Sequence, residues 1–134
     1  MNNAIEIEVA PGELIDKLTI LEIKRERIQD AEKRANVELE FAVLRSVCEA
    51  RVRSTTSLLA LRAELREVNG RLWEIEDAIR DCEKRQDFGA AFIELARAVY
   101  RTNDRRAELK REINLLLGSR LIEEKSYRPY RVGG

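Results

Sequence analysis

Two apolar stripes separated by a four-residue break constrain the fold of this chain more than any other feature. In each stripe the residues follow one another at alternating steps of three and four, and this repeat of 3.5 keeps one seam of a helix facing a partner. The first stripe comprises Leu58, Leu61, Leu65, Val68, Leu72, Ile75, Ile79 and Cys82. The second comprises Phe88, Phe92, Leu95, Val99, Thr102, Arg106, Leu109, Ile113 and Leu116. Together they predict an antiparallel helical hairpin with helices over 56–84 and 88–117.

The composition is typical of long amphipathic helices. At 134 residues the chain has room for one domain with a modest core. Charged residues make up 37% of the chain and aromatic residues 5%, with only two prolines and six glycines. This profile argues against a sandwich or barrel. We therefore predict a single all-α domain over 1–134, an antiparallel helical bundle built on the hairpin.

Charge and hydropathy exclude several classes of partner. Basic and acidic residues balance at 25 each and are interleaved, so no overall field attracts nucleic acid or an anionic membrane. No apolar run approaches the roughly 18 residues that span a bilayer. A secretory signal, with a basic region before an apolar stretch, is not visible at the N-terminus. We expect a cytoplasmic protein with no membrane partner.

The residue types available for chemistry are few. The chain has no histidine, which is the commonest general base near neutral pH and the commonest metal ligand. No catalytic or nucleotide-binding motif is present, so we expect no catalytic residue, metal or cofactor. Cys48 and Cys82 both lie on apolar stripes, and an antiparallel arrangement separates them by roughly 30 Å. Buried, reduced thiols are therefore expected.

The N-terminal residues alternate in a strand-like way before a helix begins. Residues 4–9 read Ala-Ile-Glu-Ile-Glu-Val, but six residues cannot form a sheet alone. We predict an extended arm over 1–10. Pro11 and Glu13 suit the first turn of a helix.

The segment 13–53 allows two interpretations. Its first part is apolar on several sides, which indicates a helix that is central in a bundle or shared between subunits. Further on, the apolar stripe restarts out of phase at Val37. Either one helix spans 13–53, or it breaks near Asn36, which could cap a second helix and complete a four-helix bundle. The absence of Gly and Pro from 13–69 favours the continuous helix. Such a helix would extend beyond the hairpin, and another subunit would have to cover its apolar surface between Leu14 and Ile28.

Several stretches of the chain resemble a known family. They are Pro-Gly-Glu-Leu-Ile-Asp-Lys-Leu-Thr-Ile-Leu-Glu-Ile-Lys at 11–24, Leu-Trp-Glu-Ile-Glu-Asp-Ala-Ile-Arg at 72–80, Phe-Ile-Glu-Leu-Ala-Arg-Ala-Val-Tyr at 92–100 and Glu-Glu-Lys-Ser-Tyr at 123–127. Together they resemble short, functionally uncharacterised bacterial and phage proteins, over nearly the whole chain except about 32–57. The resemblance implies an all-α domain and carries no established activity.

Polar residues in the predicted seam form the first candidate site. About a hairpin centre near 85, Asn69 lies level with Thr102 and Asn103, and Leu65 lies level with Arg106. Buried polar groups without partners cost about 1–3 kcal/mol each, so these residues must bond one another, water or a ligand. Two interpretations follow: a layer that fixes the pairing of the helices, or a binding site in which Arg106 holds a carboxylate or phosphate. An ion pair between Arg106 and Glu67 would favour the former.

Three further groups are candidates for ligand or partner binding. On the first helix, Glu22 falls within an apolar sector and Lys17 and Lys24 share a face, which suits a solvated edge, an anion site or an intersubunit salt bridge. On the hairpin, Arg80 is four residues after Glu76, as in a surface ion pair. Trp73 lies beside the seam near the level of Tyr100, and it either packs in the core or anchors an interface. The irregular tail over 118–134, expected to lie across the bundle after Gly118, interleaves basic and aromatic residues, as in proteins that bind single-stranded nucleic acid, although nearby glutamates disfavour that role. The tail residues concerned are Lys125, Tyr127, Arg128, Tyr130 and Arg131.

Two functional hypotheses remain open. The first is a non-catalytic helical-bundle interaction module that self-associates as a homo-oligomer or binds a protein partner, motivated by surplus apolar surface over 14–28. The second is a small all-α enzyme or ligand-binding domain with an Arg/Lys/Asn pocket for an anionic metabolite, in which Arg106 is central.

Overall fold

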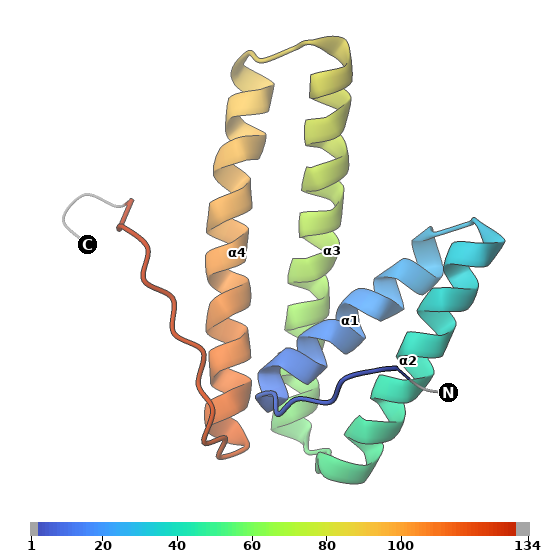
Figure 1. Cartoon of the computed structure of the whole chain (residues 1–134). Helices are drawn as coiled ribbons and strands as arrows, with labels where there is room; N and C mark the ends of the chain where they lie inside the picture. Colours follow the sequence, from blue (N-terminus) through green and yellow to red (C-terminus); the bar gives the residue numbers. More distant parts are fainter. Residues whose placement is uncertain (1–2, 131–134) are drawn as a thin grey trace.

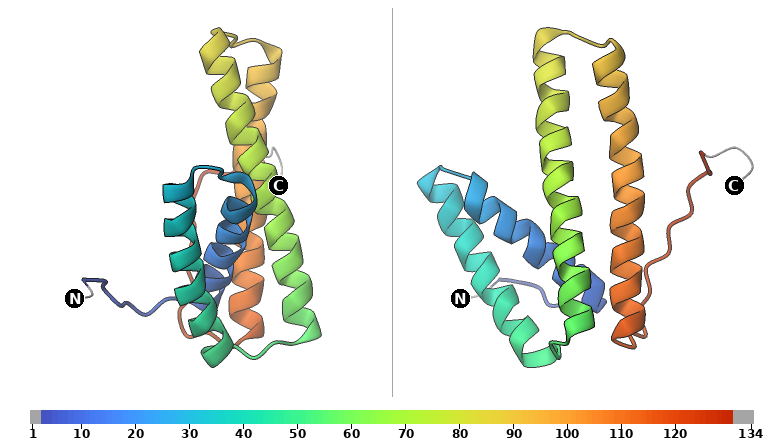
Figure 2. Two further views of the ribbon diagram at one scale, coloured as in Figure 1. Left: turned by 90° about the vertical axis from the view of Figure 1, so that its right-hand side faces the viewer. Right: turned by 180° about the vertical axis from the view of Figure 1, so that it is seen from behind.

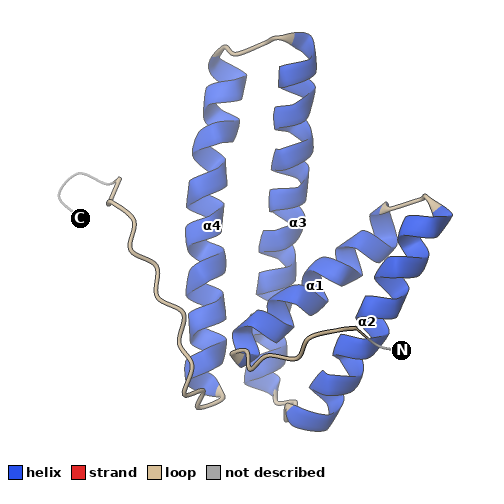
Figure 3. Cartoon of the chain, viewed as in Figure 1, coloured by secondary structure: helices blue, strands red, loops and turns tan. Residues whose placement is uncertain are grey.

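The computed structural model describes residues 3–130 and consists of four helices. They are α1 (Pro11–Arg27), α2 (Ala31–Arg51), α3 (Thr56–Arg85) and α4 (Ala90–Leu116). No strand occurs within 3–130 (Figure 3). The predicted all-α helical bundle is therefore confirmed, in its four-helix form.

The helices form two layers. α3 and α4 lie antiparallel as the predicted hairpin, and α1 crosses its lower half obliquely and contacts both of its helices (Figure 1). α2 returns antiparallel to α1 and, among the helices, contacts only α1. Figure 2 shows α1 and α2 on one face of the hairpin, whose tip projects beyond them.

The position of α1 explains why it is apolar on several sides. One side packs on the hairpin, where Ile15 joins a cluster with Leu65 and Leu109 that is shielded from solvent. Another side packs on α2, where Leu18 meets Phe41. α1 is thus the central helix of the bundle, and burial of two of its faces links the hairpin to α2.

The favoured continuous helix over 13–53 is wrong, and so is a break near Asn36. The chain leaves helical geometry at Ile28, whose φ and ψ are −81° and 125°, and α2 begins after Asp30. The Asp30 carboxylate accepts a bond of 2.9 Å from the backbone N–H of Lys33, a typical N-cap. Asn36 lies inside α2. An N-cap can therefore interrupt a helical pattern without any Gly or Pro.

The break also overturns the expected surplus of apolar surface over 14–28. α2 folds back on α1, so that Val37 and Phe41 cover Leu14, Leu18 and Leu21 within one chain. All five side chains are at most 8% exposed. No second subunit is needed to cover this side of α1.

The two helices of the hairpin begin at different kinds of cap. Thr55 caps α3, because its hydroxyl accepts a bond of 3.1 Å from the N–H of Leu58. Asp87 does not cap α4: its carboxylate accepts from the N–H of Gly89 at 3.1 Å, and Gly89 is the N-cap residue. Phe88 lies outside α4 and packs edge-on against Phe92, with ring centroids 5.3 Å apart.

Gln86 is a position where glycine should stabilise the fold. Its φ is 56°, and within 3–130 it is the one non-glycine residue with a positive φ. Left-handed geometry costs a non-glycine residue about 1–2 kcal/mol, part of which is offset here by a side-chain bond to the Glu83 carbonyl. We expect Gln86→Gly to raise the free energy of unfolding in urea by about 0.5 kcal/mol. Gln29→Gly, in a loop without a positive φ, is the matched control and should lower it; equal losses at both sites would contradict the prediction.

Ion pairs join the arm to the tail and the tail to α4. The arm over 3–10 has no regular secondary structure, and Glu8 pairs with Arg120 of the tail. Gly118 follows α4 with a φ of 66°, as predicted for a C-terminal glycine, and the tail then runs back along α4 (Figure 1). Arg131 lies outside the described residues.

Both cysteines are free thiols, Cys82 buried and Cys48 half-buried. Burial raises the pKa of the Cys48 thiol, despite the nearby Arg62 charge, and a protonated thiol is a poor nucleophile.

Within 3–130, none of the helices combines the length and the hydropathy needed to cross a bilayer.

Candidate functional site

Two of the four residues of the predicted polar layer, Asn69 and Arg106, converge on Asp16 of α1. The Nε of Arg106 donates to Asp16 Oδ1 at 2.9 Å, and its Nη2 donates to Oδ2, so the ion pair is bidentate. The Asn69 amide donates to the same Oδ1 and to the Thr19 hydroxyl, each at 2.9 Å. Asp16 is 1% exposed, Thr19 is fully buried and Asn69 is 6% exposed. One buried carboxylate therefore joins α1, α3 and α4.

The buried polar groups of this layer bond one another. The Thr19 hydroxyl donates to the Asp16 backbone carbonyl at 2.7 Å. Throughout 3–130, every fully buried side-chain nitrogen and oxygen has a hydrogen-bond partner. The bond to Asp16 raises the pKa of Arg106, despite the opposing effect of its partial burial. The layer therefore fixes how α1 sits on the hairpin, and Arg106 meets any ligand with its charge already balanced.

The pair between Arg106 and Glu67 that would have favoured a structural layer does not form within 3–130, and Arg106 bonds Asp16 instead. Glu67 is exposed and lies 3.5 Å from Arg71 on the same helix. Of the other two layer residues, Thr102 is buried and Asn103 is exposed.

A second set of polar contacts fastens the start of α1 to α4. The N–H of Gly12 donates to Asn114 Oδ1 at 2.7 Å, and Lys110 pairs with Glu13 at 2.7 Å. Burial would lower the pKa of Lys110, but the bond to Glu13 and the charge of Asp16 outweigh it and raise the pKa. Lys110 stays charged and holds the two helices together.

The sequence interpretation missed the α1 half of both networks, although a signal was present. Gly12, Asp16 and Thr19 follow one another at steps of four and three, so they share one face of a helix. A polar face beside apolar ones either faces solvent or bonds to polar partners in the interior. Because α1 is apolar on its other sides, buried partners were the better interpretation.

A cavity of about 510 Å³ opens beside the layer, where α1 diverges from the hairpin. Apolar walls from Ile20, Ile23 and Trp73 line part of it. Its charges balance, because Glu76 and Asp77 accompany the basic side chains and Asp16 neutralises Arg106. Six of the nine predicted candidates line the cavity, but without the positive excess that an anionic metabolite requires. The candidates that line it are Lys24, Asn69, Trp73, Arg80, Asn103 and Arg106.

The remaining candidates lie elsewhere. Lys17 is exposed on α1. Glu22 pairs with Arg62 and, at 3.5 Å, with Arg66, so its partners are on α3 of the same chain. Tyr100 packs edge-on against Tyr130 of the tail, with centroids 4.9 Å apart.

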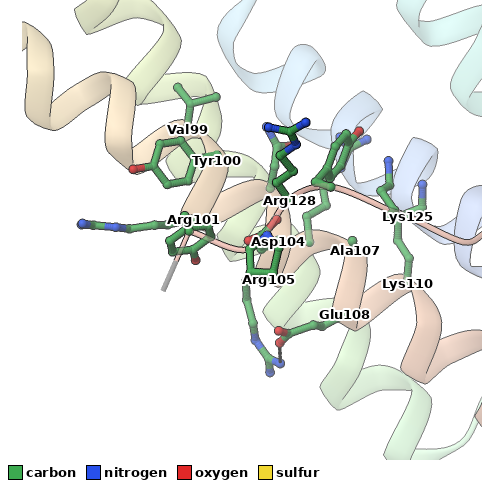
Figure 4. Close-up of a pocket in the computed structure, with 15 residues that line it drawn as sticks. Val99, Tyr100, Arg101, Asp104, Arg105, Ala107, Glu108, Lys110, Lys125 and Arg128 are labelled. Atoms are coloured by element: carbon green, nitrogen blue, oxygen red, sulfur yellow. Dashed lines mark hydrogen bonds and ion pairs between the residues drawn. The ribbon is translucent and has the colours of Figure 1, made fainter. Parts of the chain in front are cut away.

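A larger cavity of about 1,030 Å³ lies between α4 and the tail (Figure 4). Asn103 and Arg106 line this cavity as well as the smaller one, so the two adjoin across α4. Three tyrosines line it together with basic residues of both segments. Within 3–130, no group of three or more His, Cys, Asp or Glu side chains is placed to hold a metal ion.

Comparison with known proteins identifies a family for this chain. No curated protein and no solved structure matches the chain. One family does, and it is described as a family of unknown function (DUF6165). The bounds of the match enclose 32–57, where the quoted stretches gave no sign of it. Because its model matches residues 5–131, nearly the whole sequence, the chain belongs to this family of unknown function.

Proposed function

We propose that this protein is a non-catalytic helical module that self-associates through the outer face of α2. The observation that carries the proposal is a row of large apolar side chains on that face. Leu39, Val43 and Val47 are 67%, 55% and 45% exposed. α2 contacts no helix other than α1, so nothing within the bundle covers them.

The spacing makes this row a continuous stripe. The three residues follow one another at steps of four, so they lie along one side of the helix, opposite Val37 and Phe41, which face α1. Three neighbouring apolar side chains exposed on one helix mark an interaction surface more strongly than the same residues scattered singly.

A second copy of the chain is the partner that fits best. If two α2 helices pair antiparallel about a two-fold axis at Val43, Leu39 of each copy meets Val47 of the other. The acidic first turn with Glu32 then lies near the basic last turn with Arg51, and the helix dipoles oppose favourably. A contact confined to one helix per chain falls below about 1,200 Å², the low end of specific interfaces. We therefore expect a dimer with a dissociation constant on the order of 10 μM.

The test places a charge on the axis of that dimer. Wild type should approach twice the chain mass in sedimentation velocity as its concentration rises past the dissociation constant. Val43→Lys buries two facing ammonium groups, so dimerisation should weaken by at least about 30-fold, which corresponds to about 2 kcal/mol. Thermal unfolding of the monomer should shift little, because Val43 is exposed in the monomer.

Ile93→Lys is the matched control. Ile93 is 54% exposed, β-branched like valine, and lies on α4 near the hairpin tip, away from α2. The control should dimerise like wild type. A monomer at every concentration would refute self-association, and loss of the dimer only in Ile93→Lys would move the interface to the hairpin tip. The proposal takes the protein to be cytoplasmic, where free thiols such as Cys48 and Cys82 stay reduced.

A further inference from the structure

The tail is attached to α4 at two places and stands away from it between them. At its start, Glu123 lies 3.4 Å from Lys110, and Glu124 lies 2.9 Å from Arg111. At its far end, Tyr130 packs on Tyr100. The cavity of about 1,030 Å³ lies between these attachments. Its size is at the upper limit of small-molecule sites, which occupy about 300–1,000 Å³.

The floor of the cavity is one face of α4 with a small residue at its centre. Asn103, Ala107 and Lys110 follow one another at steps of four and three, so they point to the same side. The methyl group of Ala107 leaves room where a longer side chain would fill the space. Arg106 lines the cavity too, and its bond to Asp16 holds the guanidinium in place.

Six basic side chains and two acidic ones line the cavity, and carboxylates pair with four of the six basic ones. Arg105 pairs with Glu64 and Glu108, Arg106 pairs with Asp16, and both lysines pair with Glu123. Figure 4 shows Lys125 beside Lys110 and Arg128 above Asp104, whereas Arg101 extends away from the others. Within 3–130, no acidic side chain forms an ion pair with Arg128, unlike Lys110 and Lys125, which share Glu123. Arg128 is thus a cation available to a ligand.

An aromatic surface lies next to that cation. Tyr127 lines the same cavity and is 75% exposed, and no ring within 3–130 stacks on it. An exposed tyrosine ring offers a face for a planar ligand, and an arginine beside it offers donors for an anionic group.

We propose that the cavity between α4 and the tail binds a small organic anion in which a planar ring carries a phosphate or a carboxylate. The ring lies over Ala107 against Tyr127, and the anionic group is held by Arg128 with the lysines. A single-stranded nucleic acid shares both groups, but a cavity closed at two ends by the tail favours a small molecule. This inference uses a surface separate from the outer face of α2.

The experiment titrates the full chain with matched probes in isothermal calorimetry. Adenosine 5′-monophosphate and adenosine test a phosphate source, 2-naphthoate and 2-naphthamide test a carboxylate source, and inorganic phosphate tests the anion alone. We expect one ring-bearing anion to bind at least tenfold more tightly than its neutral counterpart and than inorganic phosphate. The stronger pair identifies the source of the anionic group.

Variants then locate the site. Arg128→Gln should weaken binding of the preferred anion at least tenfold, whereas Arg53→Gln, at an exposed arginine without an ion pair in 3–130, should leave it unchanged. Ala107→Leu fills the floor without changing any charge and should abolish binding of ring-bearing probes, while Val43→Lys should bind as wild type does.

Three outcomes would overturn the proposal. They are no binding of either anion at 5 mM, equal binding in Arg128→Gln, and a single-stranded oligonucleotide that binds tenfold more tightly than the mononucleotide with no effect of Ala107→Leu. Arg128 is exposed, so its variant remains informative even where Ala107→Leu fails to fold.

Discussion

Asp16→Ala is expected to lower the free energy of unfolding by about 2–4 kcal/mol, one of the two largest effects of any single substitution proposed for this protein. The variant removes both acceptors of the Arg106 guanidinium and one acceptor of the Asn69 amide. Asn69 is left in the interior with one bond fewer. Because the Arg106 side chain is 30% exposed, water recovers part of its lost solvation, which keeps the effect below the upper limit for buried ion pairs.

Urea unfolding followed by circular dichroism measures this loss, and Asp77→Ala is the matched control. Asp77 is an exposed aspartate within α3 and forms no ion pair among residues 3–130. Its removal should change the free energy of unfolding by no more than about 0.5 kcal/mol. Similar losses in the two variants would show that the buried layer stabilises the fold no more than an exposed aspartate does.

A double variant separates the ion pair from the packing around it. In Asp16→Leu with Arg106→Leu, both charges leave together and apolar side chains replace them. Such replacements are often neutral or stabilising, so the double variant should be more stable than Asp16→Ala. If it is equally unstable, the cost lies in packing rather than in an unpaired cation.

Gly12→Ala is expected to be comparably severe, by about 2–4 kcal/mol, for a steric reason. A Cβ at this position would lie 2.4 Å from the backbone carbonyl oxygen of Lys110 and 2.8 Å from Asn114 Oδ1. The first contact is with backbone, which cannot rotate away. The start of α1 would have to shift, and the bond from the Gly12 N–H to Asn114 and the pair between Glu13 and Lys110 would lengthen with it.

Gly70→Ala provides the control for this prediction. Gly70 lies inside α3, and a Cβ there would meet nothing within 4 Å. Alanine should stabilise this helix by about 0.5–1 kcal/mol, because glycine loses more backbone entropy on folding. Opposite signs for the two glycines in thermal unfolding, with a fall of about 10 °C for Gly12→Ala, are the expected result. A Gly12→Ala variant as stable as wild type would mean that α1 does not approach α4 this closely.

The local features of the fold could be predicted from the sequence because they depend on residues close together in the chain. The alternating steps of three and four predicted the hairpin, and Gly118 was identified as the end of its second helix from its chemistry. The same reasoning failed at Asp30, which is as good a cap as Thr55, because the absence of Gly and Pro favoured one long helix and the alternative break was placed at Asn36.

What the sequence by itself determined is which helices form and which of their faces are apolar or polar. The tertiary structure alone decided which faces meet. Arg106 was identified as a residue that needs a partner, but the partner is Asp16, 90 residues away, and not the carboxylate closest in hairpin register. The apolar side of α1 was assigned to another subunit, yet α2 of the same chain covers it. The physical reason is that periodicity fixes the direction of a side chain about its own helix axis, whereas its partner depends on how separate helices pack, and many pairings satisfy the same pattern.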